Sequence, residues 1–386
     1  MTYKTKAVVV GSGLNALGIV RSLAAAGVPV HLLYSDVDAA VHSRFASRQK
    51  IERTDGQALV SALLEIGKSA SDKPVLYLTE EKTVLTVSER REELLPYFRI
   101  VLPAHDTLTA LMHKQGFQQM AAELRSPIPQ AVYLRTESDL AALAGLKYPC
   151  VLKPAVKDYG YGAKFQKAYV VQTPDEAAQL YRQIAPTLSD LIVQEWIEGS
   201  DSDIYFCLQY IAADGATIAS FVGRKIRSWP PRIGGTASCT AAPEYQEKLS
   251  ALTTDFFRQV GFVGMGSMEF KRDPRDGEFY MVEPTVGRTD FQEEVATLHG
   301  HNLPLAAYCT EIGVALPPVQ AATRQTLWRE PVTDRWSLEL QPDLRNPAGV
   351  AMADAYWRWN DPLPGMQLLS GRIVDRFRYL WKRLVK

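Results

Sequence analysis

The first 34 residues join an apolar run, a glycine turn and a helical pattern, and this order constrains the fold more than any other feature. Residues 6–10 read KAVVV, Gly-Ser-Gly fills 11–13, apolar residues recur at helical spacing over 14–26, and a second apolar run follows at 28–34. This is a strand–helix–strand opening. Strand and helix patterns then continue to alternate, which predicts a parallel sheet with helices on both faces. We expect a Rossmann-like α/β domain over residues 1–106.

The glycine turn also fits a dinucleotide fingerprint. Gly11, Gly13 and Ala16 are followed by Asp36, at the spacing of about twenty residues that such sites show. A single match of this kind is weak. It leaves open the possibility of an NAD(P)-dependent oxidoreductase.

From about residue 107 the pattern changes. Several strand patterns are separated by turn signals such as Asp214-Gly215 and Asp276-Gly277, with helical stretches between them. Antiparallel strand pairs with interleaved helices predict an α+β body over residues 107–315. A C-terminal extension follows over 316–386, and its periodicity is weak before a final helical pattern.

Composition narrows the class of partner. The length of 386 residues allows two or three domains, each with its own core. Forty-three basic and 43 acidic residues cancel, so we expect a small-molecule partner and no nucleic acid. The four cysteines form no C-x-x-C pair, which argues against a zinc site and against a disulfide framework. With no signal-peptide pattern and no long apolar stretch, we expect a cytoplasmic protein, for which a homodimer is plausible.

A lysine and a glycine-rich loop suit a nucleotide. Lys153 ends an apolar strand pattern, and Gly160 and Gly162 follow in the sequence DYGYGAK. Backbone N–H groups of such a loop can close over phosphates while the ammonium neutralises them. A hairpin that carries a surface lysine would give the same pattern.

Two glutamates form the strongest local signal. Glu269 and Glu283 stand near the ends of two strand patterns that a turn at Asp276-Gly277 connects, so a hairpin brings both carboxylates onto one face. Two carboxylates suit Mg²⁺ bound together with substrate phosphates. An acidic pair on a solvated face would also fit, but Glu283 ends the apolar run FYMV, where a carboxylate needs a partner or a metal.

In their order along the chain, these segments resemble the ATP-grasp superfamily over roughly residues 1–315. The resemblance implies a small lobe at about 125–197 and a large lobe at about 198–315, which clasp ATP between them. The segment QEWIEG at 194–199 resembles the hinge whose backbone meets adenine. The implied nucleotide ligands are Lys114, Lys153, Gly160, Gly162, Lys164, Glu195, Ile197, and Asp201 or Asp203 for the ribose.

The resemblance also assigns the metal and catalytic groups. Glu269 and Glu283 correspond to the metal-binding carboxylates, and Arg288 to the arginine that steadies the transferred group. The family pattern E-x-N-P-R is replaced here by EPTVGR, so that Thr285 stands where an asparagine ligand is usual. Lys225 and Arg224 lie in a basic strand that faces the phosphate tail or a substrate carboxylate.

The implied activity is that of an ATP- and Mg²⁺-dependent carboxylate–amine ligase. A carboxylate attacks the γ-phosphate, and an amine then takes the acyl group from the acyl phosphate. Asp290, Glu293 and Glu294 are candidate ligands of the amine, although a solvated helix face explains these acids as well. A bicarbonate-dependent carboxylase and a catalytically silent ATP-binding module are also compatible with the sequence.

The last fifteen residues have the pattern of an amphipathic basic helix. Apolar residues recur at helical spacing over 372–386 with arginines and lysines mostly between them. Such a helix can dock onto its own protein, the commoner outcome, or lie on an anionic membrane surface.

Overall fold

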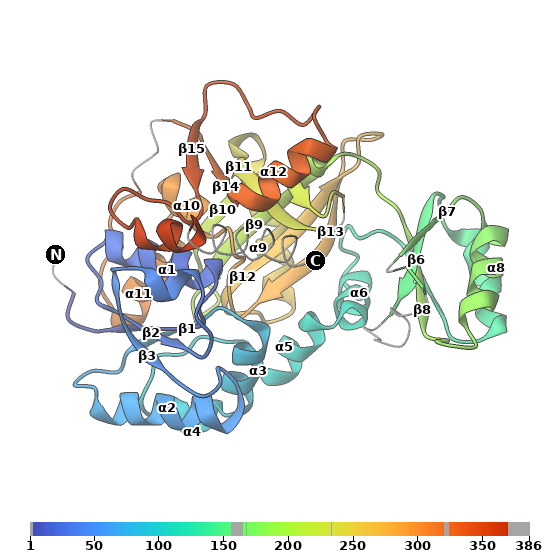
Figure 1. Cartoon of the computed structure of the whole chain (residues 1–386). Helices are drawn as coiled ribbons and strands as arrows, with labels where there is room; N and C mark the ends of the chain where they lie inside the picture. The colour runs from blue at the N-terminus through green and yellow to red at the C-terminus, as the bar shows by residue number, and fades with distance from the viewer. Residues whose placement is uncertain (1–2, 156–164, 167, 233, 320–323, 370–386) are drawn as a thin grey trace, which may run out of the picture.

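The computed structural model describes residues 3–155, 165–166, 168–232, 234–319 and 324–369. These residues form three sheets, and Figure 1 shows a small one standing to one side of a larger body. The predicted flap residues Gly160, Gly162 and Lys164, and the predicted helix over 372–386, lie outside the described residues.

The N-terminal domain is the predicted parallel sheet. Strands pair in the order β3-β2-β1-β4, all parallel, with bounds Ala46–Lys50, Val30–Tyr34, Ala7–Val10 and Val75–Leu78. At the turn after β1, a Cβ on Gly11 would lie 2.0 Å from Thr79 Oγ1 and φ is +126°, so only glycine fits. The helices are α1 (Leu14–Ala25), η1 (Ala39–His42), α2 (Gly56–Ser69), α3 (Glu81–Glu89) and α4 (Arg91–Leu94).

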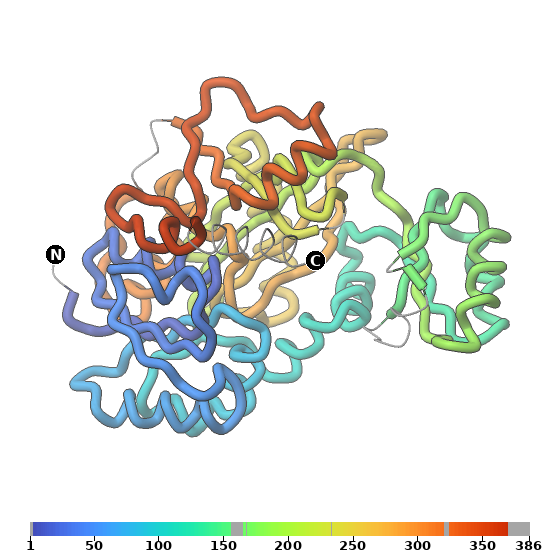
Figure 2. The backbone as a smooth tube through the Cα atoms, viewed as in Figure 1, coloured from blue at the N-terminus to red at the C-terminus, as the bar shows by residue number. Residues whose placement is uncertain are grey.

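Two helices lead to the small lobe, α5 (His105–Met112) and α6 (Lys114–Glu123). The lobe is an antiparallel sheet in the order β5-β8-β6-β7, with bounds Ala131–Leu134, Leu191–Glu195, Cys150–Pro154 and Tyr169–Val171. One face packs on η2 (Glu137–Gly145) and α8 (Pro174–Ile184), in a core that includes Leu152, Val193 and Tyr181. The opposite face of this sheet is turned toward the rest of the molecule. Figure 2 shows the small lobe standing apart from the larger body.

The large sheet is the centre of the molecule. Its order is β13-β12-β9-β10-β11-β14-β15. The inner strand β9 is buried along its whole length because both faces of the sheet are covered. One face packs on α9 (Gln246–Gln259), and the other meets α1, α10 (Glu294–Leu298) and α11 (Leu303–Ile312). The strands are β9 (Ile204–Ile211), β10 (Thr217–Trp229), β11 (Gly235–Ala241), β12 (Gly264–Arg272), β13 (Phe279–Val286), β14 (Thr326–Arg329) and β15 (Ala351–Asp354).

The C-terminal extension is built into this sheet. Strands β14 and β15 continue it beyond residue 315, where the sequence pattern predicts the end of the α+β body. Helix α12 (Pro331–Leu340) packs against β10, and the short helices η3 (Asp201–Asp203) and η4 (Pro243–Tyr245) complete the lobe. Among the described residues, no helix is long and apolar enough to cross a membrane.

Buried charges join the extension to the N-terminal domain. Arg21 on α1 donates from Nε to Asp361 Oδ2 at 3.0 Å, and Arg358 NH2 lies 2.8 Å from Glu294 Oε2. Arg21 NH1 also lies 3.7 Å from Glu294 Oε1. Asp361 is fully buried and accepts further bonds from Ser43 and from the Arg44 N–H. We call Arg21, Glu294, Arg358 and Asp361 the charge clamp.

Candidate functional site

The β12–β13 hairpin places the two predicted metal carboxylates opposite each other. Glu269 and Glu283 are cross-strand partners, and the turn between the strands contains Gly277 at φ +77°. From β10, two strands away, the buried Lys225 ammonium donates to Glu269 Oε2 at 2.5 Å. The structure therefore brings Lys225, Glu269 and Glu283 together, as the sequence predicts.

Asp290 organises the end of this hairpin. Its Oδ1 accepts from the Thr285 hydroxyl at 2.7 Å and its Oδ2 from the Ser267 hydroxyl at 2.8 Å. Ser267 and Thr285 are themselves cross-strand partners. The hydroxyl of Thr285, which stands where the family has asparagine, is thus oriented by a carboxylate that local sequence patterns do not single out for this role.

The charges in this cluster do not balance. Lys225 faces three carboxylates, those of Glu269, Glu283 and Asp290, and the further cation near Glu269, Lys271, is shared with Asp201 and Asp203. Burial lowers the pKa of Lys225, but the three carboxylates outweigh it and the pKa is raised. Burial also raises the pKa of Glu269, with Glu283 adding to the effect while Lys225 opposes it. An additional cation would relieve this excess negative charge.

The donor set fits Mg²⁺ bound jointly by protein and phosphates. In the described part of the chain, no group of three or more His, Cys, Asp or Glu side chains is arranged to hold a metal by itself. Mg²⁺ usually takes one or two carboxylates and completes its shell with water and substrate phosphates. Glu269 and Glu283 supply that number.

Arg224 does not share this site. It pairs across the strands with Tyr205, whose ring packs on Tyr245 and Phe279 on the α9 side of the sheet. Neighbouring residues of a strand point to opposite faces, so Lys225 and Arg224 are separated by the sheet itself. The expectation that both act on one substrate is therefore corrected.

Arg288 follows the hairpin, and its guanidinium contacts the backbone of the next residue. Its NH1 donates to the Thr289 carbonyl oxygen at 3.2 Å. Counting E-x-N-P-R from Glu283 puts the family's arginine at Gly287, which has φ +72° and where a Cβ would lie 2.5 Å from Val84. The arginine of this chain is therefore displaced by one position.

On the small lobe, Lys153 lies on the sheet face that the helices leave uncovered. It donates to Gln194 Oε1 at 2.9 Å. Lys114, the other predicted lysine, begins α6 and is exposed. At the hinge, the Glu195 N–H already donates to the Gln130 carbonyl oxygen, and the Glu195 carboxylate accepts from the Lys147 N–H. Any contact of Glu195 with adenine must therefore use its carbonyl oxygen.

The two predicted ribose ligands differ in environment. Asp201 is fully buried, and its two oxygens accept from the backbone N–H groups of Ser228 at 2.9 Å and Arg232 at 2.7 Å. Asp203 is half-buried and accepts from Ser200 through Oδ2. Asp201 thus has a structural task, whereas Asp203 is the more accessible carboxylate. Ile197, the other hinge residue, is buried.

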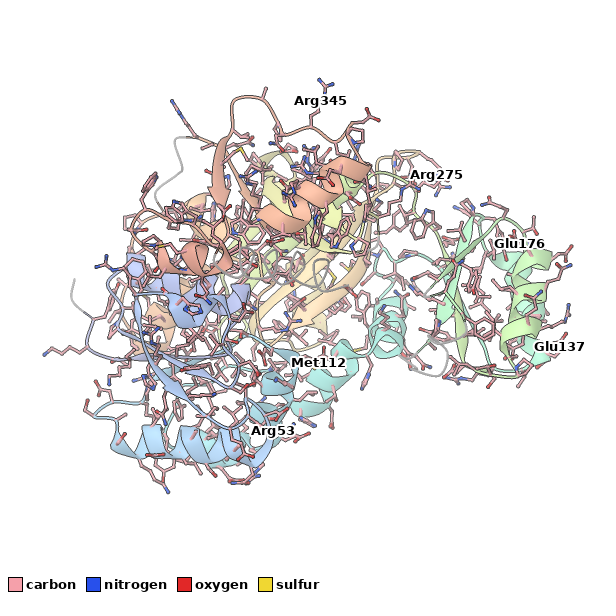
Figure 3. All side chains as sticks on the ribbon, viewed as in Figure 1. Arg53, Met112, Glu137, Glu176, Arg275 and Arg345 are labelled. Carbon is pink, nitrogen blue, oxygen red and sulfur yellow. The ribbon has the colours of Figure 1, made fainter. Side chains whose placement is uncertain are left out.

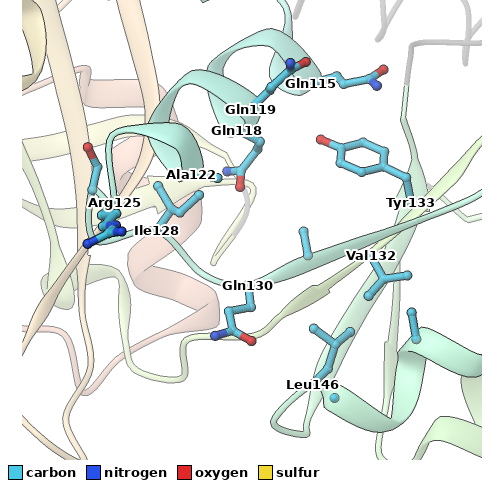
Figure 4. A pocket seen from close by; sticks show the side chains of 14 residues that line it. Gln115, Gln118, Gln119, Ala122, Arg125, Ile128, Gln130, Val132, Tyr133 and Leu146 are labelled. Atoms are coloured by element: carbon cyan, nitrogen blue, oxygen red, sulfur yellow. The ribbon is translucent and has the colours of Figure 1, made fainter. Parts of the chain in front are cut away.

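A cavity of about 670 Å³ opens between α6 and the edge strand β5 (Figure 4). Tyr133 points into it from the same sheet face that carries Lys153, and Gln115 and Gln118 line it from α6. The Tyr133 hydroxyl is buried and has no hydrogen-bond partner among the described residues. Tyr133 is not predicted from the sequence, and Gln194 is predicted only as the first residue of the hinge segment; the strand alternation around them is the one signal of a ligand-facing side.

The N-terminal glycine turn reaches the site through Asn15. Its amide donates to the Thr289 carbonyl oxygen at 2.6 Å, and the Thr289 hydroxyl donates back to Asn15 Oδ1 at 3.0 Å. Thr289 adjoins Asp290, so the turn lies beside the β12–β13 hairpin. Glu293 and Glu294 are buried, Glu293 accepts from Ser22, and Glu294 belongs to the charge clamp. The structure therefore corrects both expectations for this pair, a ligand for the amine and a solvated helix face.

Two curated proteins that are similar in sequence to this chain are ligases. The chain is 25% identical to the D-aspartate ligase of Enterococcus faecium over 338 residues, which cover 83% of this chain and 79% of the relative. It is 32% identical over 173 residues to the D-alanine–D-alanine ligase of Alkalilimnicola ehrlichii, covering 42% and 52%. No protein-family model matches.

A solved structure shows the same fold. The N5-carboxyaminoimidazole synthetase of Staphylococcus aureus superposes with a TM-score of 0.63 at 12% identity, covering 89% of this chain and 87% of that one. Fold, hairpin carboxylates and relatives agree with one another. The chain has the fold of ATP-grasp ligases and resembles such ligases in sequence.

Proposed function

We propose that the chain uses ATP and Mg²⁺ to activate a small carboxylic acid as its acyl phosphate and passes the acyl group to an amine, forming an amide. The observation that carries the proposal is the cluster of Lys225 with Glu269, Glu283 and Asp290. Its excess negative charge suits a cation, and Lys225 supplies a fixed positive charge where the phosphoryl group and the carboxylate meet. Amide-forming relatives such as D-aspartate ligase favour the same chemistry.

We assign the nucleotide to the space between the lobes. Lys114 and Lys153 would neutralise its phosphates, and the Glu195 carbonyl oxygen and Ile197 N–H would meet the adenine edge. Asp203 is assigned to the ribose in preference to Asp201, whose oxygens are used by backbone N–H groups. Gly160, Gly162 and Lys164 are retained as the predicted flap, outside the described residues.

The metal would be held by Glu269 and Glu283, with the Thr285 hydroxyl beside them. When bound, Mg²⁺ neutralises charge on the phosphates and on the group in transfer. Lys225 then orients the acid, and Asp290 keeps the Thr285 hydroxyl in place. Arg288 is assigned to the transferred group, which requires that its guanidinium leave the Thr289 carbonyl oxygen.

The test is a screen of carboxylic acids and amines in pairs for ADP release. The proposal requires ADP formation that depends on Mg²⁺, on an acid and on an amine. ATP binding without ADP release under every pair would indicate a silent module, and dependence on bicarbonate a carboxylase. A rise in melting temperature with NAD(P)H and none with MgATP would favour an oxidoreductase.

We further propose a cytoplasmic setting, in which all four cysteines are free and buried, and a peripheral membrane contact through residues 372–386. The described chain leads into that segment with Trp359 90% exposed and Leu363 and Met366 about half exposed. Truncation after Leu369 should abolish sedimentation with anionic liposomes. Equal sedimentation of both chains would dismiss the contact.

A further inference from the structure

The loop between β10 and β11 holds an arginine in a strained backbone conformation. Arg232 has φ +69°, a region that non-glycine residues seldom adopt. Its N–H donates to the buried Asp201 carboxylate at 2.7 Å, and the same carboxylate accepts from the Ser228 N–H at the other side of the loop. Strain of this kind persists where surrounding contacts over-determine it, and it concentrates at ligand sites.

The loop is also tightly closed. A Cβ on Gly234 would lie 1.9 Å from the Trp229 carbonyl carbon, so no larger residue fits there. The Trp229 ring packs on Trp336 of α12 at a centroid distance of 5.3 Å. The backbone N–H of Arg232 is thus held by Asp201 and the start of the loop by Trp336, while the Arg232 side chain is exposed.

This loop stands next to the β12–β13 hairpin. A Cβ on Gly235 would lie 3.4 Å from the ring of Phe291, the residue that follows Asp290. Along β10, Lys225 and Trp229 are four residues apart, a distance of roughly 13 Å in a strand. The loop tip that carries Arg232 therefore follows directly on the end of the strand that carries Lys225.

We propose that Arg232 is the anchor for a second anionic group of the acid substrate, so that the enzyme selects dicarboxylates over monocarboxylates. The inference rests on the proposed function, in which Lys225 and the metal handle the reacting carboxylate. Arg232 has no ion-pair partner among the described residues. Guanidinium binds a carboxylate through two parallel N–H donors, and this pairing is selective for planar anions.

Matched acids test this directly. D-Aspartate, L-aspartate and succinate are compared with β-alanine and propionate, which lack one carboxylate, in the ADP-release assay with an amine. We expect kcat/KM of the wild type to favour the best dicarboxylate by about ten- to a hundredfold, the range of a charge-assisted contact. Arg232→Asn should remove that preference and leave monocarboxylate turnover unchanged, because asparagine also tolerates the left-handed conformation.

The control is Arg345→Gln, which removes an exposed arginine elsewhere on the same lobe (Figure 3) and should change neither value. MgATP binding, followed by thermal shift, should be equal in all three proteins. Weaker MgATP binding by Arg232→Asn would place the residue at the nucleotide and overturn the anchor. So would a wild type that turns over acids without preferring dicarboxylates, or a variant that keeps the preference. Absence of ADP release with every acid and amine would instead reject the ligase itself.

Discussion

We call Lys225, Glu269, Glu283 and Asp290, which we propose to be catalytic, the catalytic cluster, and it differs from the charge clamp in its construction. The clamp residues are buried or half-buried, whereas Glu283 of the cluster is exposed. In the clamp, Arg21 and Arg358 face Glu294 and Asp361, two positive charges against two negative ones. In the cluster, Lys225 faces three carboxylates, and the further cation near Glu269, Lys271, is shared with Asp201 and Asp203. A network whose charges balance and whose hydrogen bonds are all made stabilises the fold. A network with excess negative charge favours the binding of a cation.

The largest effect should come from breaking the clamp. Arg21→Met removes the cation that pairs with Asp361 and leaves that fully buried carboxylate without an ion-pair partner, while Glu294 keeps Arg358. Loss of one member of a buried pair costs about 3–5 kcal/mol in the free energy of unfolding. Chemical denaturation measures it. The control, Arg53→Met, breaks an ion pair whose arginine is 67% exposed, and should change the free energy of unfolding far less. Equal losses would mean that the clamp contributes no more than a surface pair.

In the catalytic cluster, the same kind of change should damage turnover and spare the fold. Glu283→Gln keeps the size of the side chain but removes a charge that a hard cation requires. We expect ADP formation to fall by on the order of 10²–10³, the range for loss of one electrostatic contact in an active site. Melting temperature and ATP affinity should change little. Glu278→Gln, before the same strand, breaks an exposed ion pair with Lys248 and serves as the control. Wild-type turnover by Glu283→Gln across a Mg²⁺ titration would reduce the carboxylate pair to a structural role.

The sequence predicts one of these regions better than the other. The βαβ opening and the β12–β13 hairpin depend on local periodicity and turn residues, and both are confirmed by the structure. The clamp is not predicted, because Arg21 and Asp361 are 340 residues apart and no local pattern relates them. The same limit hides β14 and β15, whose pairing joins the extension to the large sheet.

Side-chain direction sets a second limit. Arg224 and Lys225 form one basic motif in the sequence, but the pleat of β10 sends them to opposite faces, and bulges follow between Lys225 and Ser228. The sequence suggests Asp290 only as a ligand of the amine, since its bonds to Thr285 and Ser267 depend on a turn after β13. The metal and nucleotide assignments themselves stay predictions.

A smaller effect should separate orientation from charge within the cluster. Thr285→Val removes the hydroxyl that donates to Asp290 and keeps the shape of the side chain. A hydrogen bond to a charged group contributes about 1.5–3 kcal/mol, so turnover should fall about ten- to a hundredfold. Thr285→Asn, which restores the family's residue and a donor, should be tolerated. If valine and asparagine behave alike in a Mg²⁺ titration, the Thr285 hydroxyl does not orient the site.

The smallest effect should be a gain in stability, at Glu293, which adjoins the clamp without belonging to it. Burial, with the neighbouring Glu294 charge as a second cause, raises the pKa of Glu293 to about 8. Its Oε2 is buried without a hydrogen-bond partner among the described residues. Because the folded pKa lies above the unfolded value, the native state holds a proton that the unfolded chain has released. The contribution of Glu293 to stability is therefore complete below pH about 4.5 and is lost as pH rises toward about 8.

Glu293→Gln keeps the shape of the protonated acid and cannot ionise, so it should be neutral near pH 5 and stabilising at pH 7. We expect a gain of roughly 2 kcal/mol over that interval, measured by denaturant unfolding at several pH values. The exposed Glu247→Gln should show no such trend. A gain that does not vary with pH would mean that Glu293 is ionised in the folded protein and that Arg21 and Arg358 neutralise three carboxylates. The clamp would then carry excess negative charge, as the catalytic cluster does, and charge balance would not distinguish the two regions.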